Sequence, residues 1–142
     1  MFQGCLRLHT INMPSLKKVA LSMFYGCGDL NHVKLDQAVS IEKNGFMTCA
    51  AMEKLDTVMV TSIDSSAFSY SSSLTALILR SAVVCELKNV NAFANTPIAA
   101  GTGYIYVPAA LVAEYQAAAN WNTFAAQFRA IEDYPEICDS EN

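Results

Sequence analysis

The chain has 142 residues, of which 53% are hydrophobic and only 15% charged, and its formal net charge is −4. This length fits one domain that can bury a core of useful size. Binding to nucleic acid needs clustered Lys and Arg, so a lightly charged, acidic chain argues against that class of partner. The sequence also lacks an apolar run near the roughly 18 residues of a membrane span and the basic-then-apolar start of a signal peptide.

Five phenylalanines recur at a nearly fixed interval. Phe2, Phe24, Phe46 and Phe68 are 22 residues apart, and Phe93 comes after a further 25. A cysteine stands three residues after each of the first three, and a serine after the fourth: Cys5, Cys27, Cys49 and Ser71. A constant period in this range indicates a repeat architecture.

Each repeat contains a pattern typical of a β-strand with one buried face. Apolar residues follow each Phe after six, nine and eleven positions: Leu8, Ile11, Met13; Leu30, Val33, Leu35; Met52, Leu55, with polar Thr57; and Leu74, Leu77, Leu79. The last two positions alternate with period two, as in a strand. A second extended segment carries Val19, Ile41 or Ile63, and a tight turn at Phe closes the unit.

One such unit cannot enclose its apolar residues, so successive units must stack. Stacking at about 4.8 Å places Phe on Phe and pairs the strands in a parallel ladder. We therefore predict a β-rich, right-handed solenoid of about four coils over residues 1–95, with short 3₁₀ or helical turns. The step from Leu79 to Phe93 has three extra residues. Either the last coil is widened to meet the C-terminal segment, or the repeat decays there.

The pattern changes after residue 95, and residues 96–142 are predicted to form a small α/β cap. A strand is expected at 104–107, a helix at 109–119, one more turn at 123–128 and a strand at 129–131. The acidic tail from Glu132 is expected to be loose at its end. We expect the four aromatic residues Tyr115, Trp121, Phe124 and Phe128 to pack on the last coil; a sugar-binding aromatic surface is the alternative.

The units from Phe2 to Pro14 and from Phe24 to Leu35 resemble the BspA-type leucine-rich repeat of bacterial surface proteins. The stretch Tyr104–Pro108 with Leu111, Tyr115, Trp121 and Ile131 is similar to the C-terminal segment that often accompanies those repeats, also in proteins encoded by phages. Where the family has proline after the strand, only Pro14 matches; Asp36, Val58 and Arg80 replace it. The resemblance implies a leucine-rich repeat solenoid and adhesion or protein binding at a cell surface or virion, without catalysis.

Several reactive groups are candidate sites. Cys5, His9, Cys27 and His32 vaguely match zinc spacing, but the repeat explains both cysteines. Cysteines at a core position are also unsuited to nucleophilic catalysis, and we expect all five to be thiols. The Gly101-Thr102-Gly103 stretch precedes a strand rather than a helix, so it is no dinucleotide fingerprint. We expect no enzyme activity, no metal and no cofactor.

The outward face of the strand ladder is the remaining candidate site. Its predicted exposed side chains are Thr10, Asn12, His32, Lys34, Lys54, Asp56, Ala76 and Ile78, which change from polar to apolar along the stack. If this face binds a ligand, His32, Lys34, Lys54 and Asp56 are the candidates. A plain solvated face is the alternative.

Two functions fit this prediction. The first is a binding or adhesion module of a bacterial cell surface or phage particle, with a protein or glycan as partner. The second is a structural component whose stack is itself the interface between neighbouring subunits. Because Phe2, Leu8 and Ile11 start the chain without a cover, we also expect either a longer parent protein or self-association through the first coil. The expected location is extracellular, at the cell surface or on the virion.

Overall fold

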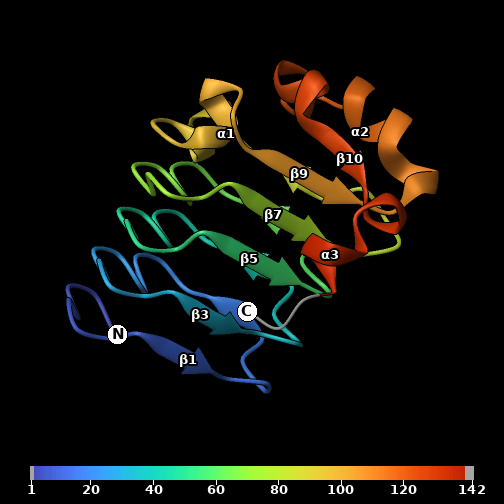
Figure 1. Cartoon of the computed structure of the whole chain (residues 1–142). Helices are drawn as coiled ribbons and strands as arrows, with labels where there is room; N and C mark the ends of the chain where they lie inside the picture. The colour runs from blue at the N-terminus through green and yellow to red at the C-terminus, as the bar shows by residue number, and fades with distance from the viewer. Residues whose placement is uncertain (1, 140–142) are drawn as a thin grey trace.

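The computed structural model describes residues 2–139 and contains two rows of parallel strands. The first row, seen from the front in Figure 1, contains β1 (Thr10–Asn12), β3 (His32–Lys34), β5 (Lys54–Thr57), β7 (Ala76–Leu79), β9 (Tyr104–Val107) and β10 (Phe128–Ala130). The second row contains β2 (Lys18–Val19), β4 (Ser40–Ile41), β6 (Ser62–Ile63) and β8 (Glu86–Leu87). The chain is thus a β-rich repeat solenoid.

The register of the strands matches the repeat. Thr10 pairs with His32 and Lys54 with Ala76, and a single bridge between Leu35 and Thr57 joins the β1–β3 pair to β5. Every strand pair is parallel, as expected when equivalent residues of successive coils lie above one another. The ladder continues past residue 95, because β9 pairs with β7 and β10 with β9.

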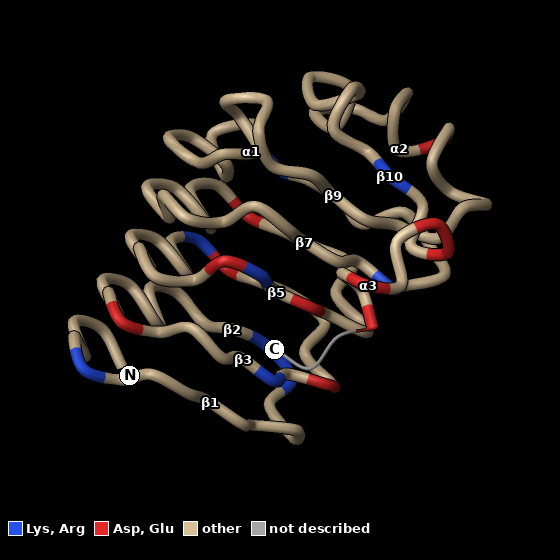
Figure 2. The backbone as a smooth tube through the Cα atoms, in the orientation of Figure 1, with Lys and Arg blue, Asp and Glu red and all other residues tan. Residues whose placement is uncertain are grey.

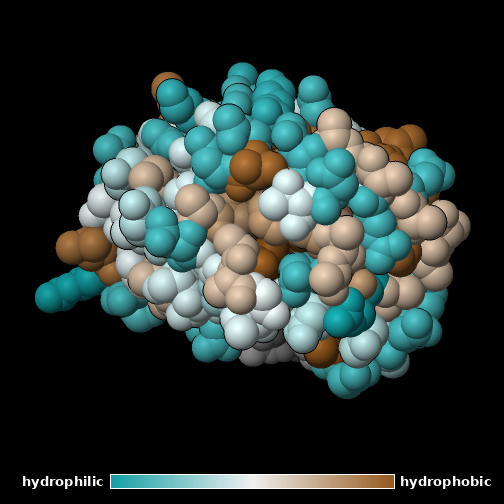
Figure 3. All heavy atoms as spheres, turned by 90° about the horizontal axis from the view of Figure 1, so that it is seen from above, coloured by the Kyte–Doolittle hydropathy of each residue, from teal (hydrophilic) through white to brown (hydrophobic). Residues whose placement is uncertain are grey.

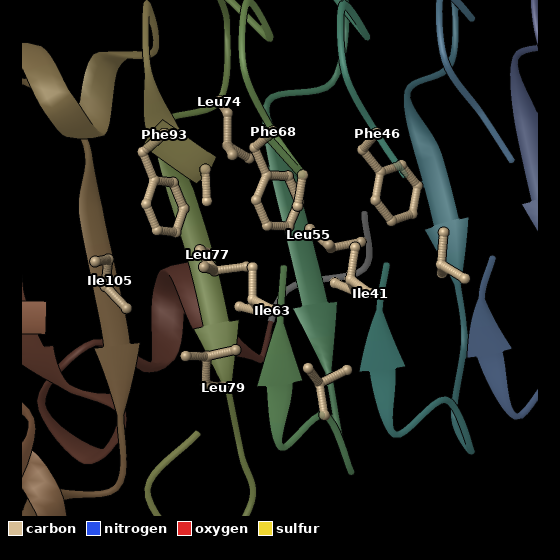
Figure 4. Close-up of a cluster of buried hydrophobic side chains, with 14 of the residues drawn as sticks. Ile41, Phe46, Leu55, Ile63, Phe68, Leu74, Leu77, Leu79, Phe93 and Ile105 are labelled. Atoms are coloured by element: carbon tan, nitrogen blue, oxygen red, sulfur yellow. The ribbon is translucent and has the colours of Figure 1, made fainter. Parts of the chain in front are cut away.

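The five repeat phenylalanines form one continuous stack through the core, and Figure 4 shows Phe46, Phe68 and Phe93 of this stack. Neighbouring rings from Phe2 to Phe93 have centroids 5.3 to 5.8 Å apart and planes within 14° of parallel. The apolar strand positions pack beside this stack, with Leu55, Leu77 and Ile105 fully buried. Thr57, the polar exception among these positions, is also buried and donates to the Ile78 carbonyl at 2.9 Å.

The turn after each Phe requires a left-handed residue. The second residue after Phe has a positive φ in all five cases: Gly4 (73°), Gly26 (76°), Thr48 (60°), Tyr70 (64°) and Asn95 (60°). The next position donates to the preceding coil. The Cys27 and Cys49 thiols bond the Phe2 and Phe24 carbonyls, at 3.0 and 3.2 Å, and the Ser71 hydroxyl bonds the Phe46 carbonyl at 2.7 Å. Serine therefore keeps the donor that the turn needs.

The C-terminal segment consists of short helices around β9 and β10. These are η1 (Val90–Phe93), α1 (Pro97–Ala100), η2 (Ala109–Leu111), α2 (Val112–Ala117), η3 (Trp121–Gln127), η4 (Ile131–Asp133) and α3 (Pro135–Cys138), with η marking 3₁₀ helices. The predicted helix at 109–119 is shorter and begins as a 3₁₀ turn. It ends at Ala117 because Ala118 has an extended backbone. The predicted strand at 129–131 lies one residue earlier, since Phe128 pairs with buried Ile105.

The four aromatic residues of this segment are packing residues. Trp121 and Phe124 lie against Phe93, with ring centroids at 5.8 and 5.3 Å, so they continue the aromatic stack. Tyr115, Trp121, Phe124 and Phe128 are each at most 6% exposed. The alternative of a sugar-binding aromatic surface is therefore wrong. Viewed from this end, the molecule presents a mixture of hydrophilic and weakly hydrophobic groups with scattered hydrophobic spots (Figure 3).

The tail forms η4 and α3 and packs against the ladder as far as Asp139. Tyr134, Ile137 and Cys138 pack against the outward side chains of β7 and β9. Consequently Ala76 and Ile78, predicted to be exposed, are 7% and 0% exposed. The predicted looseness of the chain end falls on 140–142, which lie outside the described residues.

Candidate functional site

A groove of about 990 Å³ runs over the outward face of the strand ladder. Its floor is formed by side chains of β1, β3, β5 and β7, and one wall is formed by residues 136–139 of the tail. Figure 1 shows α3 in front of the ladder, near the ends of β5 and β7. All four candidates, His32, Lys34, Lys54 and Asp56, line this groove. The structure therefore brings the predicted residues together in one hollow.

The part of the groove over β1 and β3 is open. Strand alternation points Ile11 inward, where it is 5% exposed, and leaves Thr10 and Asn12 on the outward side. His32 and Lys34 occupy the equivalent places one coil later and are also exposed. This open part thus presents hydrogen-bonding groups and one ammonium charge to solvent.

The part over β5 and β7 is occupied by the chain itself. The Lys54 ammonium donates to the Ile137 carbonyl at 3.0 Å. Asp56 accepts two hydrogen bonds from the Arg80 guanidinium, at 2.8 and 2.9 Å. Arg80 also donates to the Cys138 carbonyl. The structure therefore divides the four predicted residues. His32 and Lys34 face the open part, whereas Lys54 contacts the tail and Asp56 bonds the Arg80 side chain that also contacts it.

Charge at this junction is paired. The side chains of Arg80 and Asp56 are 28% and 35% exposed, and the Asp139 carboxylate lies 3.8 Å from the same guanidinium. Hydrogen bonding to the Asp56 carboxylate raises the pKa of Arg80, so the guanidinium stays charged at any physiological pH. Figure 2 shows how acidic and basic positions gather along β3, β5 and α3.

The other reactive groups do not converge. Cys27 is buried in the core, whereas His32 lies on the outward face, so the zinc-like set is not assembled. Within residues 2–139, no three His, Cys, Asp or Glu side chains group in a way that could hold a metal ion. All five cysteines are free thiols, and burial raises the pKa of Cys49 and of Cys85 to about 12. Those two thiols are protonated at neutral pH.

Sequence reasoning missed Arg80 and the tail residues Tyr134 and Ile137 as parts of this face. One signal was available, because the outward residues change from Thr10 and His32 to Ala76 along one row of the ladder. An apolar outward position in a strand indicates that something covers it. The sequence does not say which segment that is.

Comparison with protein families decides the family. The model of the BspA-type leucine-rich repeat region matches residues 1–103, in six copies. The chain belongs to the BspA-type leucine-rich repeat family. A search of curated proteins found no match to it.

This membership agrees with the 22-residue register and with the parallel strands described above. Members of this family are often surface or protein-binding repeats, which gives the groove a general context. Among residues 2–139, no helix is both long enough and apolar enough to cross a membrane.

Proposed function

We propose that this chain is a non-enzymatic binding module that uses the outward face of its strand ladder. The observation that carries the proposal is the groove over that face, which collects side chains from four successive strands. Solenoids generally bind along such extended surfaces, because each coil adds side chains at a fixed spacing. The open part around His32 and Lys34 is the contact region.

The partner is a protein or glycan on a host or neighbouring cell, and the chain is displayed on a bacterial surface or a phage particle. Family membership supports the general class, and the exposed polar side chains support a partner with hydrogen-bonding groups. Thr10, Asn12, His32 and Lys34 supply donors and acceptors over two rungs.

The C-terminal segment completes this module as its cap. Trp121 and Phe124 cover Phe93, and β9 and β10 extend the strand row. This arrangement removes the apolar end that an uncovered last coil would have. The right-handed path of the coils stays a prediction.

A binding screen with matched variants tests the proposed contact region. The full chain is immobilised and presented with a panel of purified bacterial surface proteins and glycans. The double variant H32A/K34A should bind any specific partner with an affinity at least about tenfold lower. The control K18A/K43A also removes two exposed side chains, but these do not line the groove. Equal binding by both double variants would refute the contact region.

A structural role in a larger assembly is the second candidate. Leu6 and Leu21 of the first coil are 65% and 63% exposed, and such leucines can support contacts between subunits. Light scattering over a range of concentrations tests this role. The double variant L6S/L21S should abolish any oligomer, and a monomer at all concentrations would count against it.

A further inference from the structure

The occupied part of the groove has the composition of a docking surface for a peptide. Along the two outward rows of the ladder, Thr10 and Asn12 on β1 correspond to Ala76 and Ile78 on β7. Tyr104 and Tyr106 on β9 continue the same two rows. The outward face is therefore polar over the first strands and apolar over β7 and β9, where the rings of two tyrosines enlarge the apolar area.

The segment covering this surface is residues 131–139, which we call the strap. Ile131, Tyr134, Ile137 and Cys138 supply its apolar contacts, and the ring of Tyr134 meets that of Tyr106 edge-on at 5.5 Å. This cluster is separate from the main core that surrounds the phenylalanine stack. The strap is therefore held by a small patch of its own, and not by the core of the solenoid.

The ladder also contacts the main chain of the strap. The two cations Lys54 and Arg80 donate to the carbonyls of Ile137 and Cys138 at the end of α3. The last carbonyls of any helical turn lack partners within that helix and carry partial negative charge. Such donors can bind a helical turn of many different sequences, because they contact its main-chain carbonyls and not its side chains.

We propose that this surface is a peptide-docking site, and that the strap occupies it until a partner peptide of the same chemistry takes its place. The partner segment is a short helical turn with an aromatic residue and an aliphatic residue three positions later, as in Tyr134 and Ile137, ending over Lys54 and Arg80. The inference rests on the proposed binding face and assigns a partner class to its second half.

Exchange does not require the ladder to open. The last strand, β10, ends at Ala130, immediately before the strap, so the strap can leave while every strand pair is kept. Segments with few buried contacts open at a lower free-energy cost than the global unfolding of a protein. The strap has that character, whereas Cys27, Cys49 and Cys85 lie inside the main core.

The first test uses the buried Cys138 thiol as a reporter of strap opening. The intact chain is exposed to a thiol reagent under native conditions, and each cysteine is monitored by mass spectrometry. Cys138 should react at least about tenfold faster than Cys49 and Cys85, which need the core to open. Excess peptide of residues 131–139 with the change Cys138→Ser should raise the rate further, because it keeps the strap from rebinding. Equal rates, or no effect of the peptide, would overturn the proposal.

The second test measures docking directly. A fluorescent peptide of residues 131–139 is titrated into the intact chain carrying Ile137→Asp, which places a carboxylate among the apolar contacts of the strap. This variant should bind the peptide at least about tenfold more tightly than the wild-type chain. Adding K54A should weaken that binding, and adding K18A should not. The proposal is overturned if the Ile137→Asp chain does not bind the peptide. It is also overturned if light scattering shows that this chain forms a dimer, because a second copy of the chain would then occupy the surface.

These tests separate the inference from the proposed function. The H32A/K34A comparison measures binding of partners to the open part of the groove, and it does not require the strap to move. If the strap is rigid but surface partners still need His32 and Lys34, only the docking inference fails. If the strap exchanges but H32A/K34A changes nothing, only the proposed contact region fails.

Discussion

Replacing Phe46 with alanine tests whether the phenylalanine stack holds the solenoid together. Phe46 lies in the middle of the stack, fully buried, with the rings of Phe24 and Phe68 at 5.3 and 5.8 Å on its two sides. Phe2 lies at the end of the stack, where it is half-buried and has one neighbouring ring at 5.4 Å. The two positions share the same repeat phase and differ mainly in burial and in the number of neighbours.

The expected losses reflect that difference. Phe→Ala at a fully buried site costs about 3–5 kcal/mol of unfolding free energy, because transfer and cavity terms add. For Phe46 we expect the upper part of this range, since two aromatic contacts of about 0.5–1.5 kcal/mol each are lost as well. For Phe2, partial burial lowers the transfer term, and we expect about 1–2 kcal/mol.

Urea unfolding monitored by far-ultraviolet circular dichroism and by Trp121 fluorescence measures both variants. Trp121 reports on the end of the stack, because its ring contacts Phe93. If neighbouring coils unfold cooperatively, Phe46→Ala should lower the urea midpoint of both signals. A loss at Phe2 equal to that at Phe46 would refute the reasoning, because the loss would then depend neither on burial nor on the number of neighbouring rings.

Three further changes test the turns, the buried thiols and the groove. Thr48→Gly should stabilise the chain by about 0.5–1 kcal/mol, because the relief of backbone strain at φ 60° exceeds the entropy cost of glycine. The control Thr10→Gly, on strand β1, should destabilise the chain. The midpoints of urea unfolding measure both changes. Because burial raises the pKa of Cys49 and Cys85 to about 12, the folded state keeps protons that the unfolded state loses above about pH 9. The contribution of these thiols to stability should therefore be constant below about pH 9 and fall between about pH 9 and 12, by about 1.4 kcal/mol per pH unit for each thiol. Cys49→Ser should reduce this slope in urea unfolding. Arg80→Met should cost about 1–2 kcal/mol and speed amide hydrogen exchange at 137–139, because it removes the donor that holds the end of α3. Unchanged exchange there would contradict this role.

The solenoid could be predicted from the sequence because its determinants repeat. Each inward position, such as Leu55 or Leu77, is repeated by the next coil at the same spacing, so the pattern shows both the strand and its buried face. The position two residues after Phe was harder to predict. Thr48 and Tyr70 adopt the left-handed conformation that Gly26 suggests for the turn, although neither residue favours it.

The strap could not be predicted, because its contacts do not repeat. Lys54 and Ile137 are 83 positions apart, and only the assembled ladder brings them together. No local pattern in residues 131–139 specifies which strand they cover. The division of the candidate site reflects this contact together with the Arg80–Asp56 pair, which engage Lys54 and Asp56 and leave His32 and Lys34 open.

The two faces of the ladder differ in how freely their residues can vary. An inward residue meets its equivalents in the coils above and below, so a change of volume at Phe46 affects two neighbours. An outward residue such as His32 points to solvent, so it can change without altering the stack. Binding properties can therefore differ strongly between chains that share this repeat. In this chain the outward residues on β7 are the apolar Ala76 and Ile78, which lie under the strap. One ladder therefore carries both an open polar surface and a covered apolar surface.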